Sequence, residues 1–186
     1  MTAGQYAAVM RLLFIMIALF ALGCESTAPP GPSDDLHGLA ERGETELLLD
    51  TVGREGGLDH RDVCQRTPLM FAAQFGRAET VRALLDAGAK IDLHEKGYYT
   101  ALMLAAGNGH AEVVDLLAGA GANVNEVEMT HGWTALIWAA KRGHAQTVQV
   151  LLRHGADAGV RDDRGWTAFD WAVAQDQRTV LQILGT

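Results

Sequence analysis

Histidine, cysteine and carboxylate side chains are the first candidates for chemistry in this sequence, because they bind metals, carry protons and act as nucleophiles. The chain has seven histidines and two cysteines. No two histidines have the HExxH spacing that places zinc ligands on one helix face, and no CxxC occurs. Asp162 and Asp163 lack the graded series of oxygen ligands of a calcium loop. We therefore predict no metal site and no cofactor.

Catalytic motifs are also absent from the sequence. It has no GxSxG around a serine, no glycine-rich phosphate loop and no carboxylate pair at a distinctive spacing. The formal net charge of -8 at pH 7 disfavours electrostatic binding to nucleic acid or to anionic lipid, since either requires a basic face. We therefore predict a protein that is not an enzyme and that does not bind nucleic acid.

The first 34 residues differ in composition from the rest of the chain. Residues 1–23 carry one charge, Arg11, followed by the apolar run LLFIMIALFAL of eleven residues, which is short for a helix that must cross about 30 Å of hydrocarbon. The run matches the apolar region of a secretory signal. Residues 24–34 hold three prolines within four positions and indicate a semi-extended tether. A buried helix is the alternative for the apolar run, but the prolines that follow argue against it.

The residues FALGC before and at Cys24 resemble the lipobox of bacterial lipoproteins, in which small residues precede a cysteine that becomes acylated. Ala21 stands where leucine is usual, a substitution that the pattern tolerates. The resemblance implies lipidation of Cys24 and a lipid-anchored location on the periplasmic side of the bacterial cell envelope. Glu25 stands where aspartate favours inner-membrane retention in enteric-type systems, so we expect the outer membrane rather than the inner. Translation from Met10 is an alternative to Met1, because nine uncharged residues precede Met10.

A threonine motif recurs through the rest of the chain, as TPL at 67, TAL at 100, TAL at 134 and TAF at 167, with spacings of 33, 34 and 33 residues. Each copy indicates two short helices, the first rich in alanine and the second with Leu and Val at helical spacing. Glycines follow the helices, as expected where the chain needs a positive φ. With its AAxxG and Gly-His elements, this pattern resembles the ankyrin repeat.

The resemblance implies an all-α fold, an ankyrin-repeat solenoid of about five stacked helix-turn-helix units over residues 35–186. The predicted units are 35–66, which is a degenerate N-terminal copy, then 67–99, 100–133, 134–166 and a C-terminal cap at 167–186. Each unit covers the apolar faces of its neighbours, so stability sums over units and interfaces. In the cap, Asp176 stands where the interior copies have glycine.

The resemblance also implies structural roles. His110 and His144 share one repeat position, where the family's histidine joins neighbouring turns through backbone hydrogen bonds. Met70, Met103 and Ile137 replace the family's histidine after the leucine, so a turn-stabilising hydrogen bond is lost and the rigidity of the turn tips is in question. The residues that precede each alanine pair are expected to pack in the core: Phe71, Leu104, Trp138 and Trp171.

Cys64 lies in the turn of the first junction, next to Gln65, which replaces the glycine usual in the family's turn. With Cys24 acylated, Cys64 would be a lone thiol that could pair between molecules or be oxidised. A passive small residue is the alternative.

Recognition by this family uses the turn tips and the concave helix face, where aromatic and basic side chains recur in this sequence. Tyr99, Trp133 and Trp166 stand directly before three of the threonines, a composition typical of interaction hot spots. Packing of these rings on the next turn is the alternative. The predicted partner-binding residues are Arg66, Phe75, Tyr99, Asn108, Trp133, Lys141, Arg142 and Trp166.

We therefore predict a monomeric, non-catalytic protein-protein interaction module that is held at the membrane by its lipid and binds an unidentified protein. The alternative is an accessory or immunity factor that protects, assembles or inhibits a periplasmic enzyme or toxin. Repeat scaffolds keep their packing and vary their contact face, so the fold does not name the partner.

Overall fold

The computed structural model describes residues 35–185. The predicted signal peptide at 1–23 and tether at 24–34, with Cys24, lie outside the described residues. Within 35–185 the chain forms ten α-helices and no strand, which confirms the all-α prediction. None of the helices in this part is both long and apolar enough to cross a membrane.

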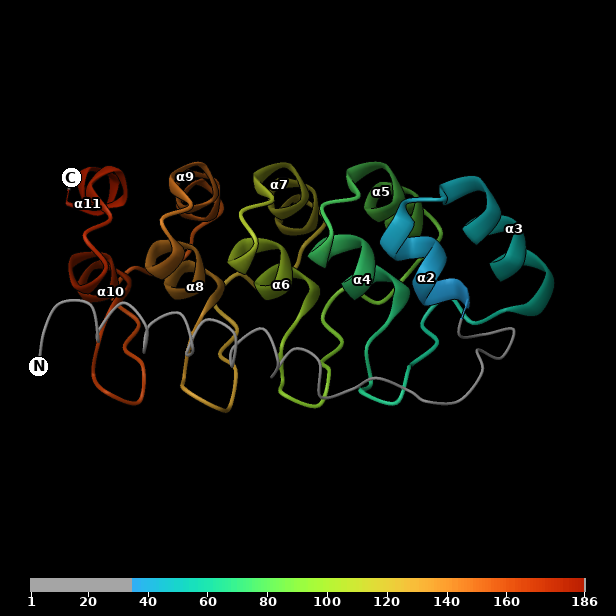
Figure 1. Cartoon of the computed structure of the whole chain (residues 1–186), viewed down its shortest axis with the longest axis horizontal. Helices are drawn as coiled ribbons and strands as arrows, with labels where there is room; N and C mark the ends of the chain where they lie inside the picture. The colour runs from blue at the N-terminus through green and yellow to red at the C-terminus, as the bar shows by residue number, and fades with distance from the viewer. Residues whose placement is uncertain (1–34, 186) are drawn as a thin grey trace, which may run out of the picture.

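The helices form two layers, in pairs that stack along one axis (Figure 1). The inner helices are α2 (Asp35–Arg42), α4 (Pro68–Gln74), α6 (Ala101–Gly107), α8 (Ala135–Arg142) and α10 (Ala168–Ala174). The outer helices are α3 (Thr45–Glu55), α5 (Ala78–Asp86), α7 (Ala111–Gly119), α9 (Ala145–Arg153) and α11 (Arg178–Leu184). Each helix packs on its partner in the pair and on the equivalent helix of the next pair.

Four loops join each outer helix to the next inner helix, and they project from the side of the inner layer that faces away from the outer helices (Figure 1). We call them fingers 1 to 4, at residues 56–67, 87–100, 120–134 and 154–167. The surface that the fingers form with the inner helices is called the inner face.

The recurring threonines start the inner helices. In α4, α6, α8 and α10 the threonine before the helix has an extended backbone, and its hydroxyl accepts a hydrogen bond from the N–H three residues on. Such a cap stabilises a helix by about 1 kcal/mol. Thr67, Thr100 and Thr134 are 1% exposed, and Thr167 is partly buried.

The core lies between the layers and between successive pairs. The alanine pairs of α4, α6 and α8 are fully buried, so small side chains allow the helices to approach closely, as the sequence predicted. Leucines and valines of the outer helices fill the rest of this core, as Val81, Leu84, Leu117 and Leu151 show at 0% exposure. Phe71 and Trp171 are buried as predicted, whereas Leu104 and Trp138 are only partly buried.

A row of hydrogen bonds links each pair to the one before it. In each pair after the first, the residue just before the outer helix donates a side-chain hydrogen bond. The acceptor is a backbone carbonyl near the end of the inner helix of the previous pair. The bonds run from Arg77 Nε to Glu41 O (2.7 Å), His110 Nε2 to Gln74 O (3.0 Å), His144 Nε2 to Gly107 O (3.1 Å) and Gln177 Nε2 to Lys141 O (3.5 Å). The backbone hydrogen bonds predicted for the two histidines are therefore confirmed.

The two histidines of this row also explain the glycines that follow α4 and α6. Gly76 and Gly109 have φ of +69° and +77°, and a Cβ on either would lie 2.6 Å from Nδ1 of His110 or His144. Glycine therefore meets both a backbone and a steric requirement. Asp176 adopts the same left-handed backbone in the last pair, with φ +51°, which aspartate tolerates better than most residues.

Candidate interaction surface

Each finger is held by a carboxylate, five or six residues before its threonine, that accepts hydrogen bonds from backbone N–H groups of the same loop. Asp62 Oδ1 accepts from the N–H groups of Cys64 and Arg66, both at 2.8 Å, and Asp162 Oδ1 accepts from Arg164 and Trp166, both at 2.9 Å. Glu95 and Glu128 do the same in fingers 2 and 3. Glu128 is completely buried.

These carboxylates correct the doubt about the turn tips. The residues Met70, Met103 and Ile137 cannot supply the family's histidine bond, but the carboxylate inside each finger closes the turn instead. The turn in fingers 1 and 2 also needs one left-handed residue, which is Gln65 (φ +66°) and Tyr98 (φ +64°), whereas fingers 3 and 4 use glycine. Gln65 therefore does stand at a position that normally favours glycine.

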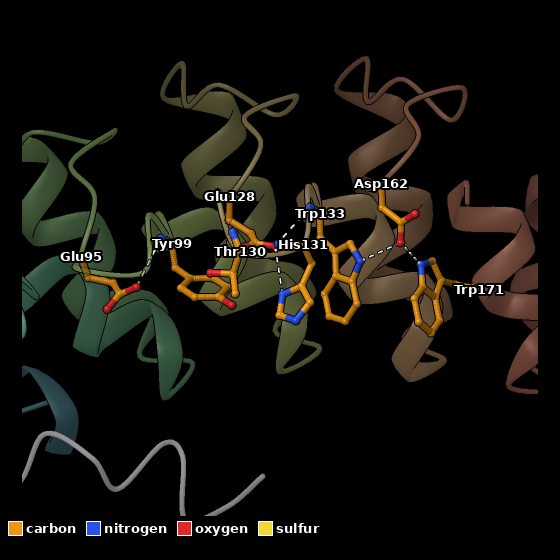
Figure 2. Close-up of polar contacts among 8 residues, drawn as sticks. All are labelled: Glu95, Tyr99, Glu128, Thr130, His131, Trp133, Asp162 and Trp171. Carbon is orange, nitrogen blue, oxygen red and sulfur yellow. Dashed lines mark hydrogen bonds and ion pairs between the residues drawn. The ribbon is translucent and has the colours of Figure 1, made fainter. Parts of the chain in front are cut away.

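Aromatic rings follow one another along the inner face. Tyr99 meets Trp138 edge-on at 5.8 Å between centroids, Trp138 meets Trp133 at 4.6 Å, and Trp133 meets Trp171 at 5.2 Å. Trp166 packs against Trp171 at 4.9 Å, and His131 stacks on Trp133 at 4.5 Å. Figure 2 shows Tyr99, His131, Trp133 and Trp171 in one row, with Glu128 and Asp162 above it. All four tryptophans of the chain belong to this row.

Asp162 connects two of these rings. Its Oδ2 accepts from the indole Nε1 of Trp133 at 2.9 Å and of Trp171 at 2.8 Å (Figure 2). Burial, the largest single influence, raises the pKa of Asp162, but the hydrogen bonds from the Trp166 backbone and the two indoles together outweigh it, so that the pKa lies below its usual value. The carboxylate therefore stays ionised inside the aromatic row.

Three cations cover the rings from the solvent side. Lys141 Nζ lies 4.0 Å from the Trp133 ring centroid and 4.4 Å from that of Trp171. The Arg142 guanidinium lies 4.9 Å from the Trp138 ring, and that of Arg164 lies 5.6 Å from the Trp171 ring. Partial burial lowers the pKa of Lys141, and the charges of Arg142 and Arg164 lower it further. We call Lys141, Arg142, Arg164 and Trp166 the basic aromatic patch.

The family model for ankyrin repeats (3 copies) matches residues 36–128 and 125–185. The chain belongs to the ankyrin-repeat family. The curated "Zygote-specific protein 3" of Chlamydomonas reinhardtii is similar, with 36% identity over 89 residues, which are 47% of this chain and 23% of that protein. The chain thus spans about a quarter of that relative's length. Ankyrin repeats are in general a non-catalytic protein-interaction fold, so this ankyrin-repeat protein has an interaction module.

The structure corrects the predicted exposure of Trp133. Its side chain is only 5% exposed, between Trp138 and Trp171 and with its N–H on Asp162, so its ring packs inside the ankyrin stack rather than facing a partner. Trp166 occupies the equivalent place in finger 4 and is 37% exposed. Packing, which the sequence left as the alternative for these rings, therefore describes Trp133.

The other predicted binding residues differ in how far their side chains already make contacts within the protein. Their role in binding stays a prediction. Arg66 pairs with Asp62 at 2.8 Å and covers the Phe71 ring at 4.3 Å. Phe75 and Asn108 are exposed at the ends of α4 and α6, and Asn108 donates to the Leu104 carbonyl at 2.8 Å. Tyr99, Lys141, Arg142 and Trp166 lie together in the row described above.

Cys64 is not the lone thiol that the sequence suggested. It is 5% exposed, and the described residues contain no free cysteine. The structure therefore contradicts the expectation of a lone thiol at this position, which followed from acylation of Cys24.

Sequence reasoning missed the contributions of Glu128, Asp162 and Arg164. The register itself held a signal: Asp62, Glu95 and Asp162 each stand five residues before a helix-capping threonine. Finger 3 has one extra residue, so Glu128 stands six before Thr134. That insertion hid the repeat of the acidic position.

Proposed function

We propose that this ankyrin-repeat protein is a non-catalytic binding module that captures a protein partner on its inner face. The observation that carries the proposal is the basic aromatic patch, where cations and the partly exposed Trp166 ring are presented on a rigid set of helices and closed fingers. Arginine and tryptophan are enriched in interface hot spots because they combine large apolar contact with directional polar groups. A rigid surface also loses little conformational entropy on binding.

Trp166→Ala tests this proposal, with Leu47→Ala as the matched control. Leu47 is 48% exposed on outer helix α3, away from the inner face, so its removal changes exposed apolar area without touching the patch. Captured protein from the native envelope fraction would be measured by mass spectrometry and its affinity by titration. We expect Trp166→Ala to weaken binding by about 2 kcal/mol, roughly thirtyfold. Equal binding by both variants would place recognition elsewhere.

We further propose that a lipid on Cys24 holds the module at the periplasmic side of the bacterial envelope, with the outer membrane preferred over the inner. The support is the FALGC pattern and the proline-rich tether, both from the sequence. The sequence has two cysteines, so Cys24 is the only cysteine with which Cys64 could form a disulfide inside the chain. Cys24 cannot carry a thioether lipid and form this disulfide at the same time. Intact-mass measurement distinguishes the two states, because lipidation adds the mass of the acyl chains and disulfide formation removes two hydrogens.

A further inference from the structure

The cations of the basic aromatic patch have no carboxylate partner in the part of the chain that the structure describes. The ion pairs among residues 35–185 involve other side chains. Arg142 donates one N–H to the Gly107 carbonyl at 2.8 Å, so other N–H groups of its guanidinium remain to donate to a ligand. A cation that lies on an aromatic face keeps its other side available for an anion.

Two acidic groups near the patch are buried, whereas Asp163, the sequence neighbour of Arg164, is exposed. Asp162 is 6% exposed, and its oxygens are occupied by two indoles and two backbone N–H groups. Glu128 is fully buried under backbone donors of finger 3. Helices α4, α6 and α8 contain no acidic residue, and their only charged side chains are Lys141 and Arg142. Helix α10 carries Asp170, whose Oδ2 accepts hydrogen bonds from the backbone N–H and the hydroxyl of Thr167.

Three of the outer helices have the opposite charge. Helices α3, α5 and α7 expose two arginines, Arg54 and Arg82, against a larger set of carboxylates: Glu46, Asp50, Glu55, Glu79, Asp86, Glu112 and Asp115. With a net charge of -8 for the chain, the positive patch stands out against an acidic body. Outer helices α9 and α11 carry one arginine each and no carboxylate. An acidic ligand is therefore repelled by the outer face at α3, α5 and α7 and attracted to the end of the stack that holds the patch.

We propose that the basic aromatic patch binds an acidic segment of the partner protein, with carboxylates against Lys141, Arg142 and Arg164 and an apolar side chain against Trp166. The cations are spread from α8 to finger 4 over three different rings, so they match several carboxylates along a chain rather than one small anion. The inference rests on the proposed function, because it names the chemistry of the partner at the same site.

Tryptophan fluorescence gives a direct assay, since all four tryptophans lie in the aromatic row and Trp166 is itself part of the patch. The full chain would be titrated with a peptide of alternating glutamate and tyrosine, and in parallel with phosphatidylglycerol vesicles and with duplex DNA. Arg164→Gln removes one exposed charge of the patch. The matched control is Arg82→Gln, which removes an exposed charge from outer helix α5.

We expect saturable peptide binding that weakens with salt, falls about tenfold in Arg164→Gln and is retained in Arg82→Gln. Equal loss in Arg82→Gln and Arg164→Gln, absence of peptide binding, or tighter binding to vesicles or DNA would overturn the inference. The peptide should also displace the protein captured from the envelope. If a protein is captured, but neither the peptide nor Arg164→Gln affects it, the binding function stands and the acidic-segment assignment fails. If no protein is captured, the proposed function fails, and the inference falls with it.

Discussion

Replacement of Asp162 by alanine is the sharpest test of how the inner face is built. The carboxylate accepts hydrogen bonds from the indoles of Trp133 and Trp171 at 2.9 and 2.8 Å and from two backbone N–H groups of finger 4. Both indoles are buried, at 5% and 6% exposure, so their N–H groups would be left without this acceptor in Asp162→Ala.

The magnitude follows from those two donors. A buried donor that loses its partner costs about 1–3 kcal/mol, so two of them cost about 2–6 kcal/mol of unfolding free energy. That is a large part of the roughly 5–15 kcal/mol typical of a whole domain. Asp162→Asn keeps one acceptor oxygen and should lose less. The lowered pKa of Asp162 also predicts how stability depends on pH. The stabilisation by its charge is fully present above the unfolded-state pKa of about 3.9 and is lost as pH falls through the lower folded-state pKa.

Urea unfolding, followed by tryptophan fluorescence and by far-ultraviolet circular dichroism, measures this effect. Fluorescence reports on the aromatic row alone, because all four tryptophans lie there, whereas dichroism reports on every helix. Asp163→Ala is the control: it removes the same charge from the adjacent, exposed residue and should change stability by less than about 0.5 kcal/mol. If Asp162→Ala and Asp163→Ala unfold at the same urea concentration, the bridging role assigned to Asp162 is refuted.

Three further outcomes are expected. Gly109→Ala should destabilise the stack by about 1–3 kcal/mol in urea melts, because its φ is +77° and the new Cβ would lie 2.6 Å from the His144 ring, while an exposed outer-helix alanine at Gly119 should cost nothing. Burial lowers the pKa of His144, so its protonation favours the unfolded chain; stability should fall as pH drops below about 6.5, and His144→Asn should flatten that part of a plot of urea midpoint against pH. Cys24→Ala should abolish lipid labelling and move the protein out of the membrane fraction, and unchanged fractionation would contradict lipid anchoring.

The sequence predicted the helix pairs well because their signals are local. The threonine that caps each inner helix and the glycine that ends it act within a few residues, and both recur with the repeat. Exposure is different, because it depends on which side chain the next unit supplies. Trp133 and Trp166 hold the same place in their fingers, yet Trp133 is 5% and Trp166 is 37% exposed, since Trp171 and Asp162 of the following units cover Trp133.

The same reasoning applies at the C-terminal end of the described chain. Phe169 and Val173 stand in register with residues that are fully buried in the interior units, namely Leu136 and Ala140, but they are 42% and 55% exposed. No further helix pair lies over α10 among the described residues. A position in the repeat therefore predicts a side chain's direction, and only the neighbouring unit decides whether that side chain is buried.

The hydrogen bonds that join successive pairs all point the same way along the chain. Arg77, His110, His144 and Gln177 each donate to a carbonyl in the inner helix of the previous pair. Each acceptor therefore precedes its donor in the sequence. In this row, no pair depends on a pair that follows it in the sequence. Truncation from the C-terminal end would therefore leave the row intact in the pairs that remain, whereas truncation from the N-terminal end would leave a donor side chain without its acceptor.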